Sequence, residues 1–101
     1  MIMVIKSMSA RSVGTDLFIG THVVDGDGAP LEGVRVRTRV DHHDGDFALA
    51  NSKLTDELGD AEFRIGDAPS GVYTARPYQL IKAGYDWDME QGVKAAEVAK
   101  S

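Results

Sequence analysis

The stretch VVDGDGAPLEGVRVRTRV, residues 23–40, determines the fold that we expect. Its first part, DGDGAP, is a turn, because glycine allows positive φ angles and proline fixes the exit from the turn. Its second part alternates strictly, and a period of two is typical of a β-strand with one buried and one solvated face. The alternation places Val34, Val36, Thr38 and Val40 on the inner face and Arg35, Arg37 and Arg39 on the outer face.

The same alternation recurs on both sides of this stretch. Turn signals separate the alternating segments about every 8–12 residues, which is typical of an antiparallel β-sandwich. We therefore predict an all-β chain with an antiparallel β-sandwich of six or seven strands over residues 1–88. The expected strands cover residues 3–10, 15–25, 31–40, 47–55, 61–65 and 72–81, and a last strand starts within 82–88.

Individual segments refine this prediction. Residues 15–25 carry apolar side chains on both faces, as a central strand would. Pro77 requires an edge or a bulge, because proline cannot donate a ladder hydrogen bond. Residues 89–101 have helix formers at their end, but a helix this short is marginal on its own. We therefore predict a tail or linker there, with a short helix as the alternative.

Composition excludes several classes of function. The 101 residues carry a net charge of −5, whereas a general nucleic-acid binder needs a basic surface. No cysteine is present, which excludes disulfides, a cysteine-based zinc site and a thiol nucleophile. No apolar run is long enough for membrane insertion, and the first residues do not resemble a signal peptide. We expect either an intracellular protein or, preferably, a module of a longer chain whose signal lies elsewhere.

Three segments carry a resemblance: VVDGDGAPLEGVRV, KLTDELGDAEFRI and PSGVYTARPYQLIKAGYDWD. Together they resemble immunoglobulin-like, carboxypeptidase-regulatory-like (prealbumin-like) accessory modules of bacterial secreted proteins. The matching residues are Asp25, Gly28, Pro30, Gly33, Val34, Thr55, Asp56, Gly59, Phe63, Gly71, Tyr73, Thr74, Lys82, Gly84, Tyr85, Trp87 and Asp88.

This resemblance implies an immunoglobulin-like sandwich of about seven strands. It also implies a non-catalytic accessory module, either a spacer, a stabiliser or an attachment domain, in an extracellular or cell-surface protein. The implied partners are a neighbouring domain of the parent protein, or a surface glycan or protein. Gly28 and Gly59 would occupy turns that need positive φ angles, and Phe63 and Tyr73 would pack in the core. Tyr85 and Trp87 would cover one end of the sandwich.

Two alternatives stay open. GTHVVDGDGAPLEGVRVR is also similar to the start of transthyretin-like proteins, which include hydroxyisourate hydrolase. That resemblance implies a site built from a first histidine, an arginine, a second histidine and a terminal Tyr-Arg-Gly-Ser. His22 matches the first histidine and one of Arg35, Arg37 and Arg39 the arginine, but the last two elements are missing. The other alternative is a structural or decoration domain of a virion or secretion device.

Candidate ligands for a metal ion gather in the segment DHHDGD, residues 41–46. Imidazole and carboxylate groups are ligands of zinc and related cations, so the candidates are His42, His43, Asp44 and Asp46, together with Asp41. Neighbouring histidines on a strand point to opposite faces, so we expect a solvated loop without a metal or cofactor. The turns at 25–28 and 56–60 lack the spacing of a calcium loop.

The arginine row is the candidate contact surface. Arg35, Arg37 and Arg39 stand ~6.6–6.8 Å apart along a strand, a spacing that could meet an acidic partner. The plainer interpretation is a solvated strand face with acidic neighbours such as Glu62. No nucleophile or phosphate-binding motif occurs, so we expect no catalytic residues and no enzyme. The aromatic residues Tyr73, Tyr78, Tyr85 and Trp87 could form a sugar platform, although core packing is the commoner role.

Overall fold

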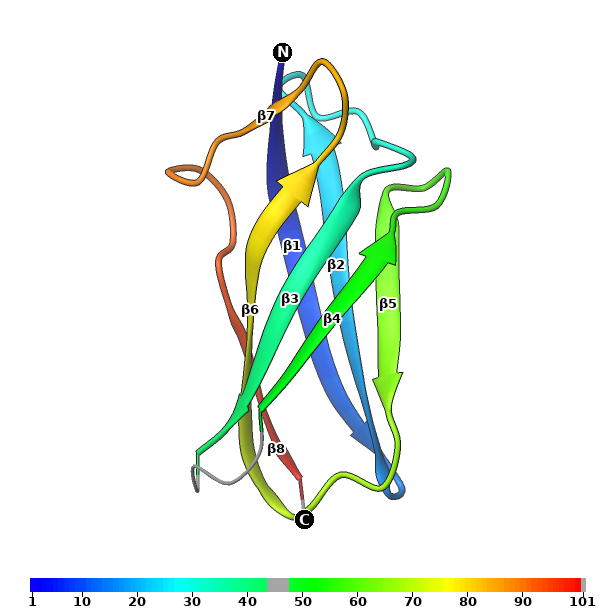
Figure 1. Cartoon of the computed structure of the whole chain (residues 1–101), viewed down its shortest axis with the longest axis vertical. Coiled ribbons are helices and arrows are strands. Elements are labelled where there is room, and N and C mark those ends of the chain that lie inside the picture. The colour runs from blue at the N-terminus through cyan, green and yellow to red at the C-terminus, as the bar shows by residue number, and fades with distance from the viewer. Residues whose placement is uncertain (44–47, 101) are drawn as a thin grey trace.

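The computed structural model describes residues 1–43 and 48–100, which form two four-stranded sheets packed face to face (Figure 1). The first sheet has the order β5-β2-β1-β7 and the second the order β4-β3-β6-β8. No helix occurs in the described ranges, so the all-β prediction is confirmed, with eight strands instead of about seven. The strands are β1 (Ile2–Val13), β2 (Asp16–Asp25), β3 (Arg35–His42), β4 (Ala48–Leu54), β5 (Asp60–Ile65), β6 (Gly71–Ile81), β7 (Asp86–Trp87) and β8 (Ala96–Lys100).

Neighbouring strands pair antiparallel, except for the short parallel pair of β1 and β7. β2 lies between β1 and β5, as predicted for a strand with apolar residues on both faces. In the other sheet, β3 lies between β4 and β6. The pairing of β2 and of β3 with their neighbours therefore determines which residues lie side by side across each sheet.

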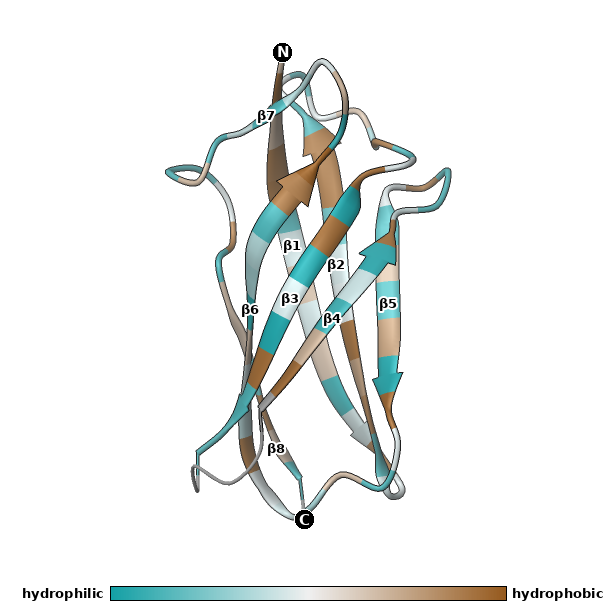
Figure 2. Ribbon diagram, in the orientation of Figure 1, coloured by the Kyte–Doolittle hydropathy of each residue, from teal (hydrophilic) through white to brown (hydrophobic). Residues whose placement is uncertain are grey.

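The alternation of β3 has the predicted outcome. Val36, Thr38 and Val40 are buried, whereas Arg35 and Arg37 are half-buried and Arg39 is exposed. The alternating hydropathy along β3 and its neighbours is visible in Figure 2. The strand lies further along the chain than the expected segment 31–40. It begins at Arg35 and continues through Asp41 and His42.

The core between the sheets divides into two hydrophobic clusters. Met8 packs against both clusters. Thr21 and Thr38 are buried at positions between the clusters along β2 and β3. The first cluster contains Met3, Ile5, Val23, Leu31, Val34, Val36, Ala61 and Leu80, and the second Leu17, Ile19, Val40, Ile65, Ala68, Tyr73 and Ala75.

The predicted core aromatics have different outcomes. Tyr73 is fully buried, as expected, and its hydroxyl donates a hydrogen bond to the carbonyl of Pro69. Phe63 packs against the same cluster from the inner face of β5, but it is only half-buried because β5 is an edge strand. Tyr85 and Trp87 pack against the other cluster.

The predicted tail is wrong for residues 96–100, which form β8 on the free edge of β6. Val98 lies opposite Tyr73 in this pairing and packs against the core, and Lys100 is also buried. Local helix propensity is a weak preference, and the unpaired backbone groups of β6 provide a stronger partner. The two-sheet unit therefore extends beyond residue 88.

Pro77 sits at a bulge of β6, as predicted. Arg37 pairs with Gln79 and Thr38 with Pro77, so Tyr78 is the extra residue. On the other side of β6, pairing with β8 covers only residues 71–75. Pro77 consequently needs no ladder hydrogen bond toward either neighbour.

The two acidic turns close through their own carboxylates. Asp25 Oδ1 accepts hydrogen bonds from the backbone amides of Asp27 and Ala29, and Gly28 has a φ angle of 89°. In the β4–β5 turn, Asp56 Oδ1 accepts from two backbone amides in the same way, and Gly59 has a φ angle of 79°. Both glycines occupy the left-handed region that the resemblance implied.

Candidate functional site

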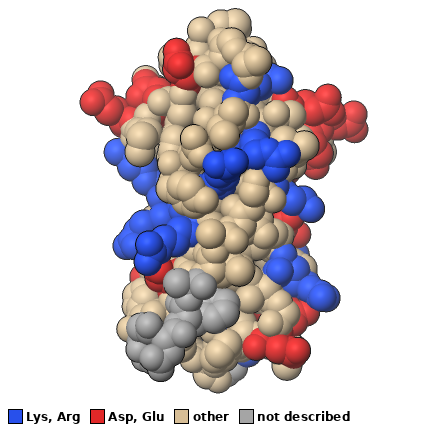
Figure 3. Space-filling model, viewed as in Figure 1, with Lys and Arg blue, Asp and Glu red and all other residues tan. Residues whose placement is uncertain are grey.

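The outer face of the second sheet carries the predicted arginine row in the middle of three strands. Figure 3 looks onto this face and shows basic side chains across it, with acidic ones mostly toward its margins. We call its basic side chains and the exposed apolar ones beside them the arginine face: Arg35, Arg37, Arg39, Arg76, Leu54, Tyr78 and Ile81.

The register of β4, β3 and β6 arranges this face in rows. Arg35 lies between Leu54 and Ile81, which are 50% and 42% exposed. The next row places Arg37 between Ser52 and Gln79, and the third brings Arg39 beside Arg76. Apolar side chains therefore flank one end of a positively charged strip.

The arginines of this face have few acidic partners. Asp41 is the only acidic residue of β3, β4 and β6, and it lies 2.9 Å from Arg39 and 3.9 Å from Arg76. Arg35 donates to the Ser52 hydroxyl and Arg37 to the Gln79 side-chain carbonyl, both neutral acceptors. Within the described part of the chain, no carboxylate is in ion-pair range of Arg35 or Arg37. The face thus holds a surplus of positive charge.

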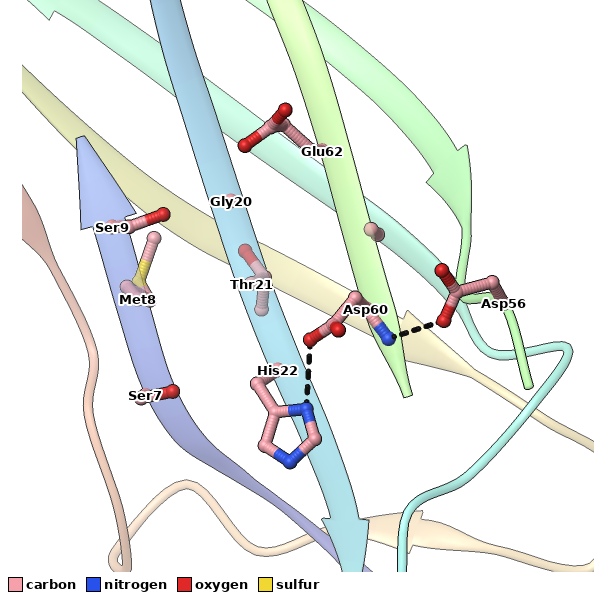
Figure 4. A pocket seen from close by; sticks show the side chains of 10 residues that line it. Ser7, Met8, Ser9, Gly20, Thr21, His22, Asp56, Asp60 and Glu62 are labelled. Carbon is pink, nitrogen blue, oxygen red and sulfur yellow. Dashed lines mark hydrogen bonds and ion pairs between the residues drawn. The ribbon is translucent and has the colours of Figure 1, made fainter. Parts of the chain in front are cut away.

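The outer face of the first sheet contains a hollow of about 440 Å³, shown in Figure 4. It is built from two cross-strand rows of β1, β2 and β5, the first Ser7–His22–Asp60 and the second Ser9–Gly20–Glu62. We call the outer face of β1, β2 and β5, which carries these six residues, the hollow face. The full lining is Ser7, Met8, Ser9, Gly20, Thr21, His22, Asp56, Asp60, Ala61 and Glu62.

Gly20 makes the hollow possible, because the centre of β2 has no side chain on this face. A Cβ atom at this position would lie 2.6 Å from Ser9 Oγ and 3.7 Å from Glu62 Oε2. Ser9 therefore leans over the bare backbone of Gly20, and the floor of the hollow is main chain.

Acceptor groups dominate the rim of the hollow. His22 Nδ1 lies 2.8 Å from Asp60 Oδ1. Because a carboxylate only accepts, the imidazole donates from Nδ1, which leaves Nε2 of the neutral ring as an acceptor. Asp56 and Glu62 add two further carboxylates.

The arginines of this face have carboxylate partners, in contrast to Arg35 and Arg37 of the arginine face. Arg11 lies 3.7 Å from Glu62 and stacks over the ring of Phe18, 4.5 Å from its centroid. Arg64 lies 3.5 Å from Asp16 on the same face. Each arginine here has a carboxylate partner, so little positive charge remains for another molecule.

The structure does not assemble the site implied by the transthyretin-like resemblance. His22 lies on the outer face of β2, whereas Arg35, Arg37 and Arg39 lie on the outer face of the opposite sheet. The hydrophobic core separates the histidine from every candidate arginine. These residues therefore do not form one site.

The candidate metal ligands also separate. The ring of His42 points inward and stacks on Tyr73 with a centroid distance of 4.6 Å, and its Nε2 contacts the carbonyl of Ser70. His43 instead contacts the Thr74 hydroxyl at 2.7 Å. Asp44 and Asp46 lie outside the described residues. Among the residues that are described, no three potential ligands are grouped to hold a metal ion.

Sequence reasoning missed the hollow face, because its rows depend on strand register. A bulge between Ile5 and Ser7 shifts β1 by one residue and turns Ser7 outward. Without the bulge, strict alternation would put Ser7 on the inner face with Ile5. The one available signal was Gly20 inside an alternating strand, which often marks a close approach or a cavity.

Comparisons with known proteins add no relative. No protein-family model matches the chain, and searches of curated proteins and of solved structures give no significant match. Among the described residues, no helix has the length and apolar character that crossing a membrane requires. The two outer faces of the sheets are therefore the features of the molecule that bear on its function.

Proposed function

We propose that this chain is a non-catalytic, immunoglobulin-like accessory module of a larger secreted or cell-surface bacterial protein, and that it attaches to an acidic protein surface through the arginine face. The observation that carries the proposal is the charge distribution. The chain has a net charge of −5, yet on one face Arg39 and Arg76 share the carboxylate of Asp41. Among the described residues, Arg35 and Arg37 of the same face contact only a hydroxyl and an amide. Such a concentration of one sign favours a partner of the opposite sign.

Two features of the fold support the immunoglobulin-like assignment. The Tyr73 hydroxyl bonds back to Pro69 at the corner between β5 and β6, which resembles the tyrosine corner of these domains. The order β5-β2-β1 also resembles the E-B-A strands of the immunoglobulin fold, and the order β3-β6-β8 resembles its C-F-G strands. β4 lies beside β3 instead of β5, and β7 is an additional strand.

The side chains between the arginines favour a protein over a glycan as partner. Leu54, Tyr78 and Ile81 are 50%, 52% and 42% exposed. Exposed aliphatic side chains gain from contact with apolar protein surface, and tyrosine and arginine are enriched in protein interfaces. A sulfated or carboxylated glycan would engage the arginines but would leave Leu54 and Ile81 in water.

The hollow face also contains residues that bear on catalysis. His22 and Asp60 resemble the base and orienting acid of a hydrolase, and Ser7 is the cross-strand neighbour of His22. Nucleophilic catalysis uses a hydrogen bond between hydroxyl and imidazole, which is often longer before a substrate binds. Within the described part of the chain, none joins Ser7 to His22.

Retention on anionic resins tests this proposal. A chain of net charge −5 should pass through immobilised poly-L-glutamate unless its positive charge is concentrated. We expect retention at low ionic strength and release as salt rises, because exposed charges are screened over ~8–10 Å. Arg35→Gln/Arg37→Gln should abolish retention, whereas the matched control Arg11→Gln/Arg64→Gln, with the same net charge, should keep it.

Three results would overturn the proposal. Flow-through of the unchanged chain at low salt would show that the arginine face attracts no polyanion. Equal loss in both double variants would show that net charge, not this face, controls retention. Much stronger retention on heparin than on poly-L-glutamate would identify an acidic glycan as the partner.

A further inference from the structure

We propose that the acidic surface bound by the arginine face is the hollow face of a second copy of this chain, so that copies stack head to tail. This inference rests on the proposed function, because it uses the same arginine face and names its partner. Charge complementarity within one molecule carries the argument. The two faces lie on opposite sides of the two-sheet unit. One carries a row of arginines, and the other contains a hollow lined by carboxylates.

The chemistry of the two faces matches group by group. A guanidinium offers five N–H donors and no acceptor, so it needs a site rich in acceptors. The hollow provides the carboxylates of Asp56, Asp60 and Glu62, each with two acceptor oxygens. On the other face, Arg35 and Arg37 contact only neutral acceptors among the described residues, and they keep donors for another molecule.

The shapes of the two faces also fit. The hollow has a volume of about 440 Å³, and its floor is the bare backbone of Gly20. The opposing surface is a row of long side chains that project from β3. A projecting arginine that enters the hollow would meet this backbone and the Ser9 hydroxyl that leans over it, and a hydroxyl can accept a hydrogen bond from a guanidinium.

The area of the faces is sufficient for a specific interface. The molecule measures 40 × 23 × 17 Å along its principal axes. A face of the two longer dimensions can supply the ~800 Å² per partner that standard interfaces bury. Leu54 and Ile81 would lose water in this contact, which adds apolar burial to the ion pairs.

The geometry predicts an open assembly. The contact joins two different faces, so each added copy leaves one arginine face and one hollow face available. Heterologous contacts of this kind build rings when the rotation closes and filaments when it does not. Growth should therefore depend on concentration and should weaken with salt.

Two complementary variants test the stacking by sedimentation velocity. Arg35→Gln/Arg37→Gln removes the donor side of the contact, and Asp60→Asn/Glu62→Gln removes the charge of the acceptor side. The unchanged chain should form species larger than the 10.9 kDa monomer at low salt, and it should dissociate on dilution and at high salt. Each variant alone should stay monomeric. Their mixture should form 1:1 dimers and nothing larger, because only one functional contact can form.

The outcomes separate the two proposals. Monomers at every concentration, together with retention on poly-L-glutamate that needs Arg35 and Arg37, would overturn the stacking and leave the proposed function standing. Assembly that persists in either variant, or a mixture that grows beyond dimers, would also overturn the head-to-tail contact. If the unchanged chain were neither retained on poly-L-glutamate nor assembled at low salt, both the stacking and the proposed function would be overturned. Circular dichroism of each variant establishes that both remain folded.

Discussion

The two outer faces of this molecule are built on the same kind of sheet, but their arginines have different partners. On the hollow face, Arg11 and Arg64 each lie beside a carboxylate. On the arginine face, Arg35 and Arg37 contact a hydroxyl and an amide instead. Outward orientation alone therefore does not make a charged row a binding surface, because neighbouring strands decide whether its charges are already paired.

This difference also explains why the arginine face is the better candidate for attachment. An arginine that pairs with a carboxylate of its own face keeps little positive charge for an acidic partner, and exposed pairs contribute only ~0–1 kcal/mol to stability. Unpaired arginines contribute little to folding as well, so their concentration on one face favours a role outside the isolated domain.

The largest effect should come from the core that separates the two faces. Ile19 is 1% exposed and packs in the second cluster, so Ile19→Ala should lower the free energy of unfolding by ~2–5 kcal/mol. Val13→Ala is the control, because Val13 is 49% exposed and should cost less than ~0.5 kcal/mol. Urea denaturation measures both. Similar losses would show that the inner and outer faces of the first sheet are misassigned.

The next effect concerns the turn at the rim of the hollow. Asp56 Oδ1 accepts from the amides of Leu58 and Asp60, so Asp56→Ala should cost ~1–2 kcal/mol by leaving both without this partner. Glu57→Ala changes the same charge in the same turn and should cost less than ~0.5 kcal/mol. If thermal unfolding gave equal losses for the two variants, the carboxylate would not be the element that closes this turn.

A smaller effect should come from the corner between the sheets. Tyr73→Phe removes the hydrogen bond to Pro69 without creating a cavity, and the loss should be ~1 kcal/mol. Tyr78→Phe is the matched control at an exposed position and should be neutral within ~0.5 kcal/mol. An unchanged midpoint in chemical denaturation for Tyr73→Phe would remove the main support for an immunoglobulin-like corner.

The smallest effects compare single arginines of the two faces. Arg11→Gln should cost ~0.5–1 kcal/mol, because Arg11 stacks on Phe18 and pairs with Glu62. Arg37→Gln should cost less than ~0.5 kcal/mol, since its one partner is the neutral Gln79. Differential scanning calorimetry resolves the order of the two. A reversed order would contradict the contrast between paired and unpaired faces.

The sequence allowed the prediction of features that depend on a few neighbouring residues. Alternation placed Val36 and Arg37 on opposite faces, and the turn residues Gly28 and Gly59 have the expected positive φ angles. Pro77 correctly indicated a bulge, because one missing donor constrains one position. Tyr73 was correctly placed in the core.

Features that depend on pairing between distant strands were not predicted. Residues 96–100 carry helix formers, and only the free edge of β6 makes them a strand. The row Ser7–His22–Asp60 joins three strands and requires the bulge of β1. Nor did alternation distinguish Arg37 from Arg11, because a partner on another strand is invisible to a local pattern.

Mapping the contact surface by NMR tests the central claim most directly. Titration of the 15N-labelled chain with a hexaglutamate peptide should shift the arginine Nε–H signals of Arg35 and Arg37 and the amides of β3. It should be done at low salt and at a concentration where the chain is monomeric. We predict that signals of β1, β2 and β5 stay in place and that salt reverses the shifts. Shifts centred on Arg11 and Arg64, or spread evenly over both faces, would contradict the claim that the arginine face is the attachment surface.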